Sequence, residues 1–168
     1  WTDADSDTPT YSYQWKRGST NVGTNSNSYA LTSADAHANM KVVVTANDGN
    51  GGLTSATSAI KAVTNTTPVN TVLPAISGTA KVGNNLSATT GTWTDADGDT
   101  PTYSYQWKRG GTNVGTNSNS YALTAADAHA NMTVVVTAND GNGGTPSATS
   151  AITAIANAIP VNTVLPVI

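Results

Sequence analysis

The chain has 168 residues, a formal net charge of −3 and no cysteine, which excludes disulfide cross-links. Only 10% of its residues are charged, against about 25% in an ordinary soluble domain, and all ten acidic residues are aspartate. The sequence has no basic run and no stretch near the ~18 apolar residues that span a bilayer, which argues against a nucleic-acid-binding surface and a transmembrane segment.

The sequence repeats itself with an offset of 92 residues. Residues 1–76 and 93–168 are identical at 64 of 76 positions. Near-identical copies at a domain-sized period are typical of arrays of repeated modules, in which each module provides length and joins its neighbours. The repeat therefore favours a structural or adhesive protein over an enzyme.

Strand signals recur every 8 to 12 residues with Gly, Asn, Asp and Pro between them, and no sustained helical period is present, so the sequence predicts an all-β fold. Tyr103, Tyr105 and Trp107 alternate with polar residues and so share one apolar strand face. We expect Trp107 and its counterpart Trp15 to be buried between two sheets. In chain order, the predicted strands of the complete module are 72–76, 86–93, 103–108, 121–123, 132–138 and 148–155, with a turn at 81–84.

These elements divide the chain into three parts. Residues 1–67 form an incomplete repeat that lacks the first two strands, residues 68–159 form a complete repeat, and residues 160–168 match the first strand of a further repeat. Pro68 and Pro160 lie in the linkers, where a fixed φ stiffens the junction. Either flanking sequence is missing, or the tail of one chain completes the open repeat of another by strand addition, giving head-to-tail filaments.

Three motifs carry a resemblance that covers essentially the whole chain. The Tyr-x-Tyr-Gln-Trp-Lys-Arg-Gly strand at 103–110 and the Leu-Thr-x-Ala-Asp-Ala-His-Ala-Asn-Met turn at 123–132 resemble the immunoglobulin-like repeats of large bacterial surface and adhesin proteins. The Asp-rich segment 95–103 resembles the loops of bacterial cadherin-like repeats. The resemblance implies tandem immunoglobulin-like β-sandwiches in a surface stalk. Because cysteine is absent, we expect Trp107 to pack against aliphatic side chains alone.

Aspartates alternate along one loop of each repeat and recur in a second loop, after the strand at 132–138 and its first-copy counterpart. Clustered carboxylates repel one another unless a cation neutralises them, and Ca²⁺ accepts oxygen ligands of this kind. In immunoglobulin topology the two loops lie at one end, beside the linker 68–70, so we expect an oxygen cage at the junction between modules. The alternative is a solvated turn with side-chain-to-backbone hydrogen bonds. The candidate metal ligands are Asp3, Asp5, Asp7, Asp48, Asp95, Asp97, Asp99 and Asp140.

No catalytic residue is predicted. His37 and His129 lie in predicted turns, and the sequence pairs neither with a nucleophile or a metal site. Adjacent aspartates on one loop fit glycoside hydrolysis poorly, because that reaction needs two carboxyl groups facing each other across a cleft. The alternating aromatic residues favour a packed core over a sugar-stacking platform.

The sequence thus predicts a non-enzymatic repeat module of a bacterial cell-surface stalk, adhesin or filament. Its expected partners are neighbouring copies of the same repeat, its expected ligand is Ca²⁺, and its expected location is extracellular or at the cell surface. Two alternatives remain: a binding module whose exposed loops, such as 112–119, hold a glycan or a protein, and an accessory domain of an extracellular enzyme.

Overall fold

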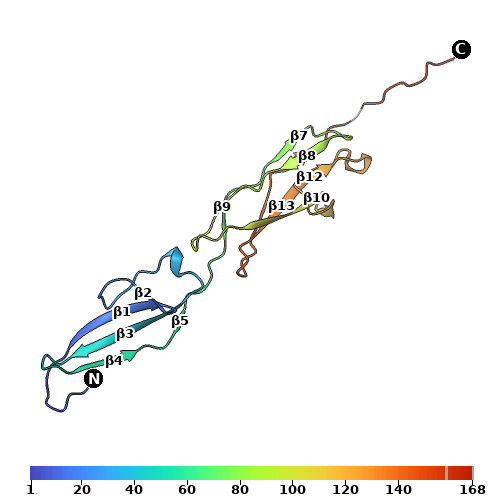
Figure 1. Cartoon of the computed structure of the whole chain (residues 1–168). Coiled ribbons are helices and arrows are strands. Elements are labelled where there is room, and N and C mark those ends of the chain that lie inside the picture. Colours follow the sequence, from blue (N-terminus) through green and yellow to red (C-terminus); the bar gives the residue numbers. More distant parts are fainter. Residues whose placement is uncertain (158, 168) are drawn as a thin grey trace. The chain divides into compact units, whose positions relative to one another are not determined.

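The computed structural model describes residues 1–157 and 159–167, which form two compact units, residues 1–66 and 67–168 (Figure 1). Almost all regular structure is β-strand. The helices among the described residues are two single 3₁₀ turns, η1 (Ser33–Asp35) and η2 (Ala125–Asp127). No helix in the described part of the chain has the length and apolar character needed to cross a membrane.

The larger sheet of the second unit is built around the two strands with the clearest alternation in the sequence. β10 (Thr102–Arg109) and β13 (Asn131–Asn139) pair antiparallel, with Trp107 opposite Val134. β11 (Thr112–Val114) extends the sheet beyond β10, while β14 (Ser147–Thr149) and β15 (Thr153–Ala154) both pair with β13. Alternate residues of β13 are fully buried, so its apolar face lies on the core.

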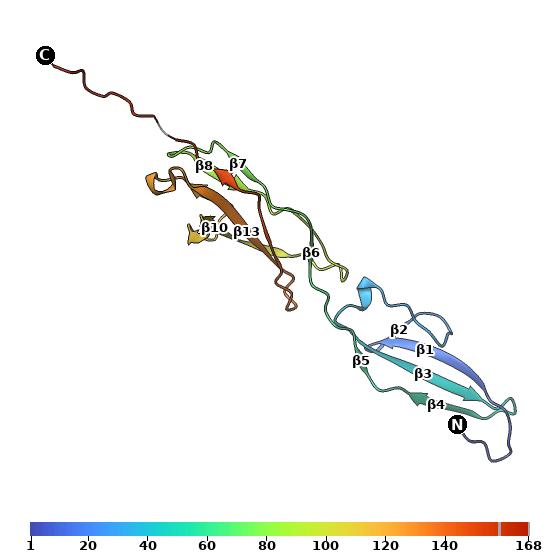
Figure 2. The ribbon, with the colours of Figure 1, turned by 180° about the vertical axis from the view of Figure 1, so that it is seen from behind.

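The second sheet covers that apolar face. It has the order β12 (Ser120–Ala122), β8 (Asn85–Ala88) and β7 (Ile76–Gly78), and Figure 2 shows β7 and β8 facing β10 and β13. A further pair, β6 (Val69–Val72) with β9 (Thr92–Thr94), continues the first two strands. The core between the sheets contains Leu86, Trp107, Met132, Val134 and Val136, each fully buried. The predicted all-β sandwich is therefore confirmed in this unit.

Three predicted strands differ from the observed ones. The predicted first strand, 72–76, was misplaced, because it covers the gap between β6 and β7 and shares only its two end residues with them. The second is split into β8 and β9 around Gly91, where φ is +76° and an added Cβ would lie 2.2 Å from the Val72 carbonyl oxygen. The last is split into β14 and β15 at Ser150. The Ser150 hydroxyl takes the place of a backbone acceptor for the Val134 N–H, at 3.1 Å.

The surroundings of Trp107 correct a second expectation. Its indole stacks on Tyr121, with ring centroids 5.6 Å apart, and its Nε1–H donates to the Ser118 carbonyl oxygen at 2.9 Å. The prediction that only aliphatic side chains surround it was wrong. The stacked ring and the indole hydrogen bond satisfy both the apolar and the polar part of the side chain.

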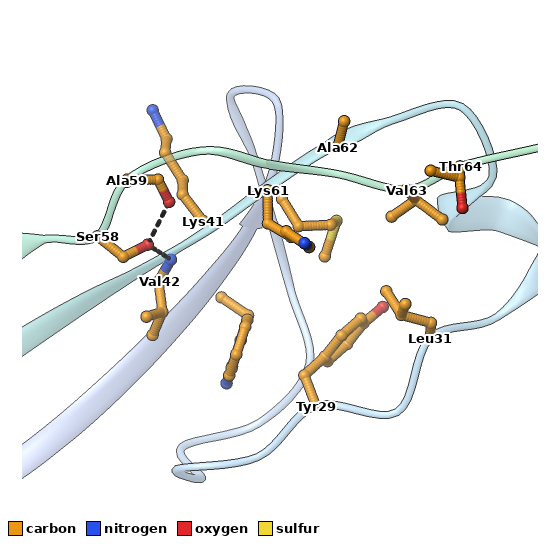
Figure 3. Close-up of a pocket in the computed structure, with 12 residues that line it drawn as sticks. Tyr29, Leu31, Lys41, Val42, Ser58, Ala59, Lys61, Ala62, Val63 and Thr64 are labelled. Atoms are coloured by element: carbon orange, nitrogen blue, oxygen red, sulfur yellow. Dashed lines mark hydrogen bonds between the residues drawn. The ribbon is translucent and has the colours of Figure 1, made fainter.

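The first unit repeats the larger sheet alone. β1 (Thr10–Arg17), β2 (Thr20–Val22), β3 (Asn39–Asn47), β4 (Leu53–Thr57) and β5 (Lys61–Ala62) have the same order and register as their counterparts. Within residues 1–66, all of which are described, no strand lies over its inner face, and Tyr29 and Leu31 line a hollow there (Figure 3). Trp15 is consequently only half-buried, whereas Trp107 is fully buried. The prediction that both indoles lie between two sheets was right for Trp107 and wrong for Trp15.

Candidate metal centre

The loop between β9 and β10 in the second unit positions the first carboxylate. The Asp97 N–H donates to Asp95 Oδ1 at 2.8 Å, and Gly98, at φ +81°, donates its N–H to the Asp95 carbonyl oxygen at 3.3 Å. This local turn fixes the Asp95 side chain. Its second oxygen, Oδ2, is buried and has no hydrogen-bond partner. A buried carboxylate oxygen without a partner carries a desolvation cost.

The loop after β13 supplies the second group. Asp140 Oδ1 accepts the N–H groups of Asn142 at 2.8 Å and Gly144 at 2.9 Å, which hold the loop around the carboxylate. An added Cβ on Gly144 would lie 2.1 Å from Asp140 Oδ2 and 3.0 Å from Pro68. Pro68 is fully buried, so the incoming segment of the unit packs against this loop.

One hydrogen bond ties the two loops together. The Asn142 side-chain amide donates to Asp99 Oδ2 at 2.9 Å. As a result Asp95, Asp99 and Asp140 offer oxygen atoms that all lie within 4.8 Å of one another, and Asp140 is 8% exposed. Asp97 lies outside this three-carboxylate group.

The donor set is suited to a hard cation. Three carboxylates at such short distances repel one another, and Ca²⁺ takes six to eight oxygen ligands from carboxylates, carbonyls and water. The unpartnered Oδ2 of Asp95 is the kind of atom that a cation would satisfy. The three residues therefore fit the ion that the sequence suggested.

The first unit has the same loops in a looser arrangement. Asp5 donates its N–H to Asp3 Oδ1 at 2.8 Å, and the Asn50 amide donates to Asp7 Oδ2 at 2.8 Å, as in the second unit. Asp3, Asp7 and Asp48 line a hollow of about 180 Å³. Within residues 1–66, however, no three carboxylates approach to the distance found in the second unit.

The pKa of Asp48 lies below its usual range. The backbone N–H groups of Asn50 and Gly52 donate to the carboxylate at 2.7 and 2.9 Å and favour its charged form more than desolvation opposes it. Pro68, which packs on the corresponding loop of the second unit, has no counterpart in residues 1–66.

Sequence reasoning missed a second kind of acidic site. Asp127 is fully buried, yet it accepts hydrogen bonds from Arg109 Nε at 2.7 Å, the Thr124 N–H at 2.7 Å and the Tyr121 hydroxyl at 3.1 Å. Desolvation raises its pKa, but the Thr124 backbone and hydroxyl, Arg109 and Tyr121 together outweigh it and hold the pKa below its usual range.

This network caps the η2 turn. Thr124 and Asp127 form a reciprocal capping box, and the first unit repeats it with Thr32 and Asp35. The Thr-x-x-Asp spacing was the signal in the sequence that identifies it. Every oxygen of this carboxylate is used inside the fold, so its role is structural.

The two histidines occupy turns, as predicted. His37 and His129 have φ of +59° and +63°, directly after the capped 3₁₀ turns. This left-handed conformation is unusual for a residue with a Cβ. Both histidines lie where the backbone reverses direction, so their positions have a structural explanation.

Comparison with known proteins gives few matches. No protein-family model matches the chain, and no curated protein matches its sequence. Among solved structures, the amphioxus IgVJ-C2 molecule is 16% identical over 90% of this chain and 91% of its own, with a TM-score of 0.48. Domains A168–A170 of titin are 16% identical over 89% of this chain and 55% of theirs, with a TM-score of 0.39. The strand order and register described above make the chain all-β and give the second unit an immunoglobulin-like sandwich architecture without disulfides.

Proposed function

We propose that the chain is a stretch of a structural array on a bacterial cell surface, in which immunoglobulin-like modules form a stalk, adhesin shaft or filament. The observation that carries this proposal is the near-identity of the two copies, 64 of 76 residues. Selection on a binding or catalytic site tolerates divergence elsewhere in a domain. Near-identical copies favour a role in which each module does the same work as its neighbour.

The fold supports a structural role. The fully buried carboxylate of the second unit, Asp127, is consumed by hydrogen bonds within the fold, and the aromatic residues of β10 pack on the core. The polar, weakly charged composition suits an exposed array, because hydroxyl and amide groups keep the surface hydrated. The proposed partners are neighbouring copies of the repeat.

We also propose that the group of Asp95, Asp99 and Asp140 binds Ca²⁺. A bound ion would neutralise the three carboxylates, satisfy the buried Asp95 Oδ2 and hold together the two loops and the Pro68 segment. Binding to the folded state alone would stabilise the second unit by RT ln(1 + [L]/Kd), about 2.7 kcal/mol at a hundredfold excess over Kd.

The surface location is tested on the organism that makes the protein. Antibodies raised against the full chain should label intact cells, and external protease should remove that signal without lysis. The matched control is a cytoplasmic marker, which should resist protease and become visible only after permeabilisation. If the antibody signal from this protein, like that of the marker, appears only after permeabilisation, the proposed surface location is wrong.

A further inference from the structure

The loop after β13 contains the dipeptide Asn142-Gly143, which occurs at one other place in the sequence, Asn50-Gly51 in the matching loop of the first unit. An asparagine before glycine is the pair most open to spontaneous deamidation, because no Cβ shields the backbone nitrogen that attacks the amide. Both residues of each pair are exposed, and a Cβ added at Gly143 would meet no atom within 4 Å. Water and the attacking nitrogen can therefore both reach the Asn142 side chain.

Hydrogen bonding in this loop sets Gly143 apart from its neighbours. Four N–H groups of the loop donate hydrogen bonds at 2.8 to 3.2 Å, those of Asp140, Gly141, Asn142 and Gly144. In the described part of the chain the Gly143 N–H donates none, and its φ of +110° is one that glycine adopts without strain. The nitrogen that follows Asn142 is thus available to react.

The reaction changes the charge of the side chain. The Gly143 nitrogen forms a bond to Cγ of Asn142, and the amide nitrogen leaves as ammonia with the Gly143 N–H proton, which gives a cyclic imide. Water then cleaves the imide. Cleavage of the new bond leaves aspartate, and cleavage of the original backbone bond leaves isoaspartate, in which the backbone continues through Cγ. Both products carry a carboxylate in place of a neutral amide.

We propose that Asn142 is a site of spontaneous deamidation, by which the amide that joins two loops becomes a fourth carboxylate beside Asp95, Asp99 and Asp140. The Asn142 amide donates to Asp99 Oδ2 at 2.9 Å. A carboxylate has no proton to donate, so attraction between the loops becomes repulsion between like charges. Deamidation therefore loosens the two loops when no cation is bound.

The first unit repeats the arrangement. The Asn50 amide donates to Asp7 Oδ2 at 2.8 Å, and the Asn50 N–H donates to Asp48 Oδ1 at 2.7 Å. Each asparagine-glycine pair of the sequence thus holds an aspartate of the neighbouring loop. We expect the same reaction at Asn50.

A second consequence rests on the calcium binding proposed above. With Ca²⁺ bound, a fourth carboxylate adds ligand charge, and the number of charged ligands tunes the affinity of oxygen sites for this ion. Deamidation would replace a hydrogen bond between the loops by a stronger attraction of both loops to the ion. The modified chain should therefore depend more on calcium than the newly made chain.

The hydrogen bond to Asp99 slows the reaction but does not prevent it. Ring closure requires the Asn142 side chain to rotate, and one exposed hydrogen bond to a charged acceptor lowers the fraction of free side chains by roughly tenfold. Asn139, in the same loop, is an internal comparison. It is also exposed, but it precedes Asp140, which has a Cβ and whose N–H donates to the Gly144 carbonyl oxygen at 3.2 Å.

The test is incubation of the full chain in mildly alkaline buffer, which favours loss of the Gly143 N–H proton, with peptide mass spectrometry at intervals. We expect the mass gain for replacement of –NH₂ by –OH at Asn142 and Asn50, at a rate at least roughly tenfold above that at Asn139. An Asn142→Gln chain should stay unmodified at this position, because glutamine has to close a larger ring.

A second measurement uses an Asn142→Asp chain, which contains the aspartate product from the start. Calorimetric melting in chelator should give a lower midpoint than the wild-type chain, and calcium titration should give roughly tenfold tighter binding. If neither chain binds calcium, the proposed metal is wrong, whereas the mass spectra and the melting in chelator still decide whether deamidation occurs and loosens the loops.

Two results would overturn the inference. One is a rate of deamidation at Asn142 that is zero or no higher than at Asn139, which would mean that the Gly143 nitrogen does not reach the side chain. The other is an Asn142→Asp chain that melts in chelator at the wild-type midpoint or above it, which would mean that the amide does not hold the loops together.

Discussion

The change Asp95→Asn should have opposite effects on stability with and without calcium. Three carboxylates lie within 4.8 Å of one another in the second unit. Two unit charges at that separation repel by about 1 kcal/mol in bulk water and about 3 kcal/mol at the effective dielectric of a protein surface. Without metal, removing one charge relieves two such repulsions, so we expect the midpoint of unfolding to rise by several degrees.

With calcium the sign reverses. The wild-type chain gains about 2.7 kcal/mol at a hundredfold excess of ion over Kd, and Asp95→Asn should lose most of that gain because a charged ligand is gone. Differential scanning calorimetry in a chelator and in millimolar calcium measures both effects. The control is Asp5→Asn, which makes the same charge change in the matching loop of the first unit, where no three carboxylates approach to this distance.

Two outcomes would refute this reasoning. A wild-type melting curve that is the same in chelator and in calcium rejects the metal. If Asp95→Asn lowers stability as much in chelator as in calcium, the Asp95 carboxylate stabilises the loop directly and not through a bound ion. Magnesium in place of calcium should stabilise less, because it tolerates fewer protein ligands.

Three further predictions follow from the structure. Leu123→Ala should cost about 2 to 5 kcal/mol and Leu31→Ala under about 1 kcal/mol in urea unfolding, because Leu123 is 4% exposed and Leu31 58%; equal costs would contradict the open face. Because the folded pKa of Asp127 is depressed, its stabilisation is present above the unfolded value of about 3.9 and is lost as pH falls through the lower folded value; Asp127→Asn should flatten stability below about pH 4, and an unaltered acid slope would contradict this. His129→Gly should change the melting midpoint little, whereas His129→Val should lower stability by about 1 to 2 kcal/mol at φ +63°; equal effects would rule out backbone strain.

The strands that the sequence predicted best are those with strict alternation on a half-buried sheet. β10 and β13 lie where Tyr103 to Trp107 and Met132 to Ala138 placed them, because a period of two leaves one choice of inward face. The interruptions were not predictable. Gly91 breaks a strand because the backbone at Val72 approaches it, and that contact is between residues far apart in the sequence.

The candidate site was predictable in outline only. Alternation suggested that three aspartates of one loop act together, but the group that forms with Asp140 contains Asp95 and Asp99 and not Asp97. Immunoglobulin topology indicated that Asp140 would lie near this loop, and the structure brings it there. Metal binding stays a prediction.

The exposure of Trp15 shows that identical local sequence in two repeats does not determine the burial of a side chain. Trp15 and Trp107 stand in identical local sequence, so pattern alone gives them the same burial. Their difference comes from β7 and β8, which lie over one copy and not the other. The burial of a side chain depends on both packed sheets. The alternation within one strand indicates only which face of its own sheet the side chain is on.

If each complete repeat is a structural module of a stalk or filament, as proposed, it should resist stretching as one cooperative unit. Single-molecule pulling between the ends of the second unit tests it most directly, in calcium and in chelator. We expect one cooperative unfolding step at a force that calcium raises. Its length should be the roughly 300 Å of extended chain between Val69 and Ala156 less the distance between these residues in the folded unit. An extension that grows smoothly from zero force, with no step in either buffer, would contradict it.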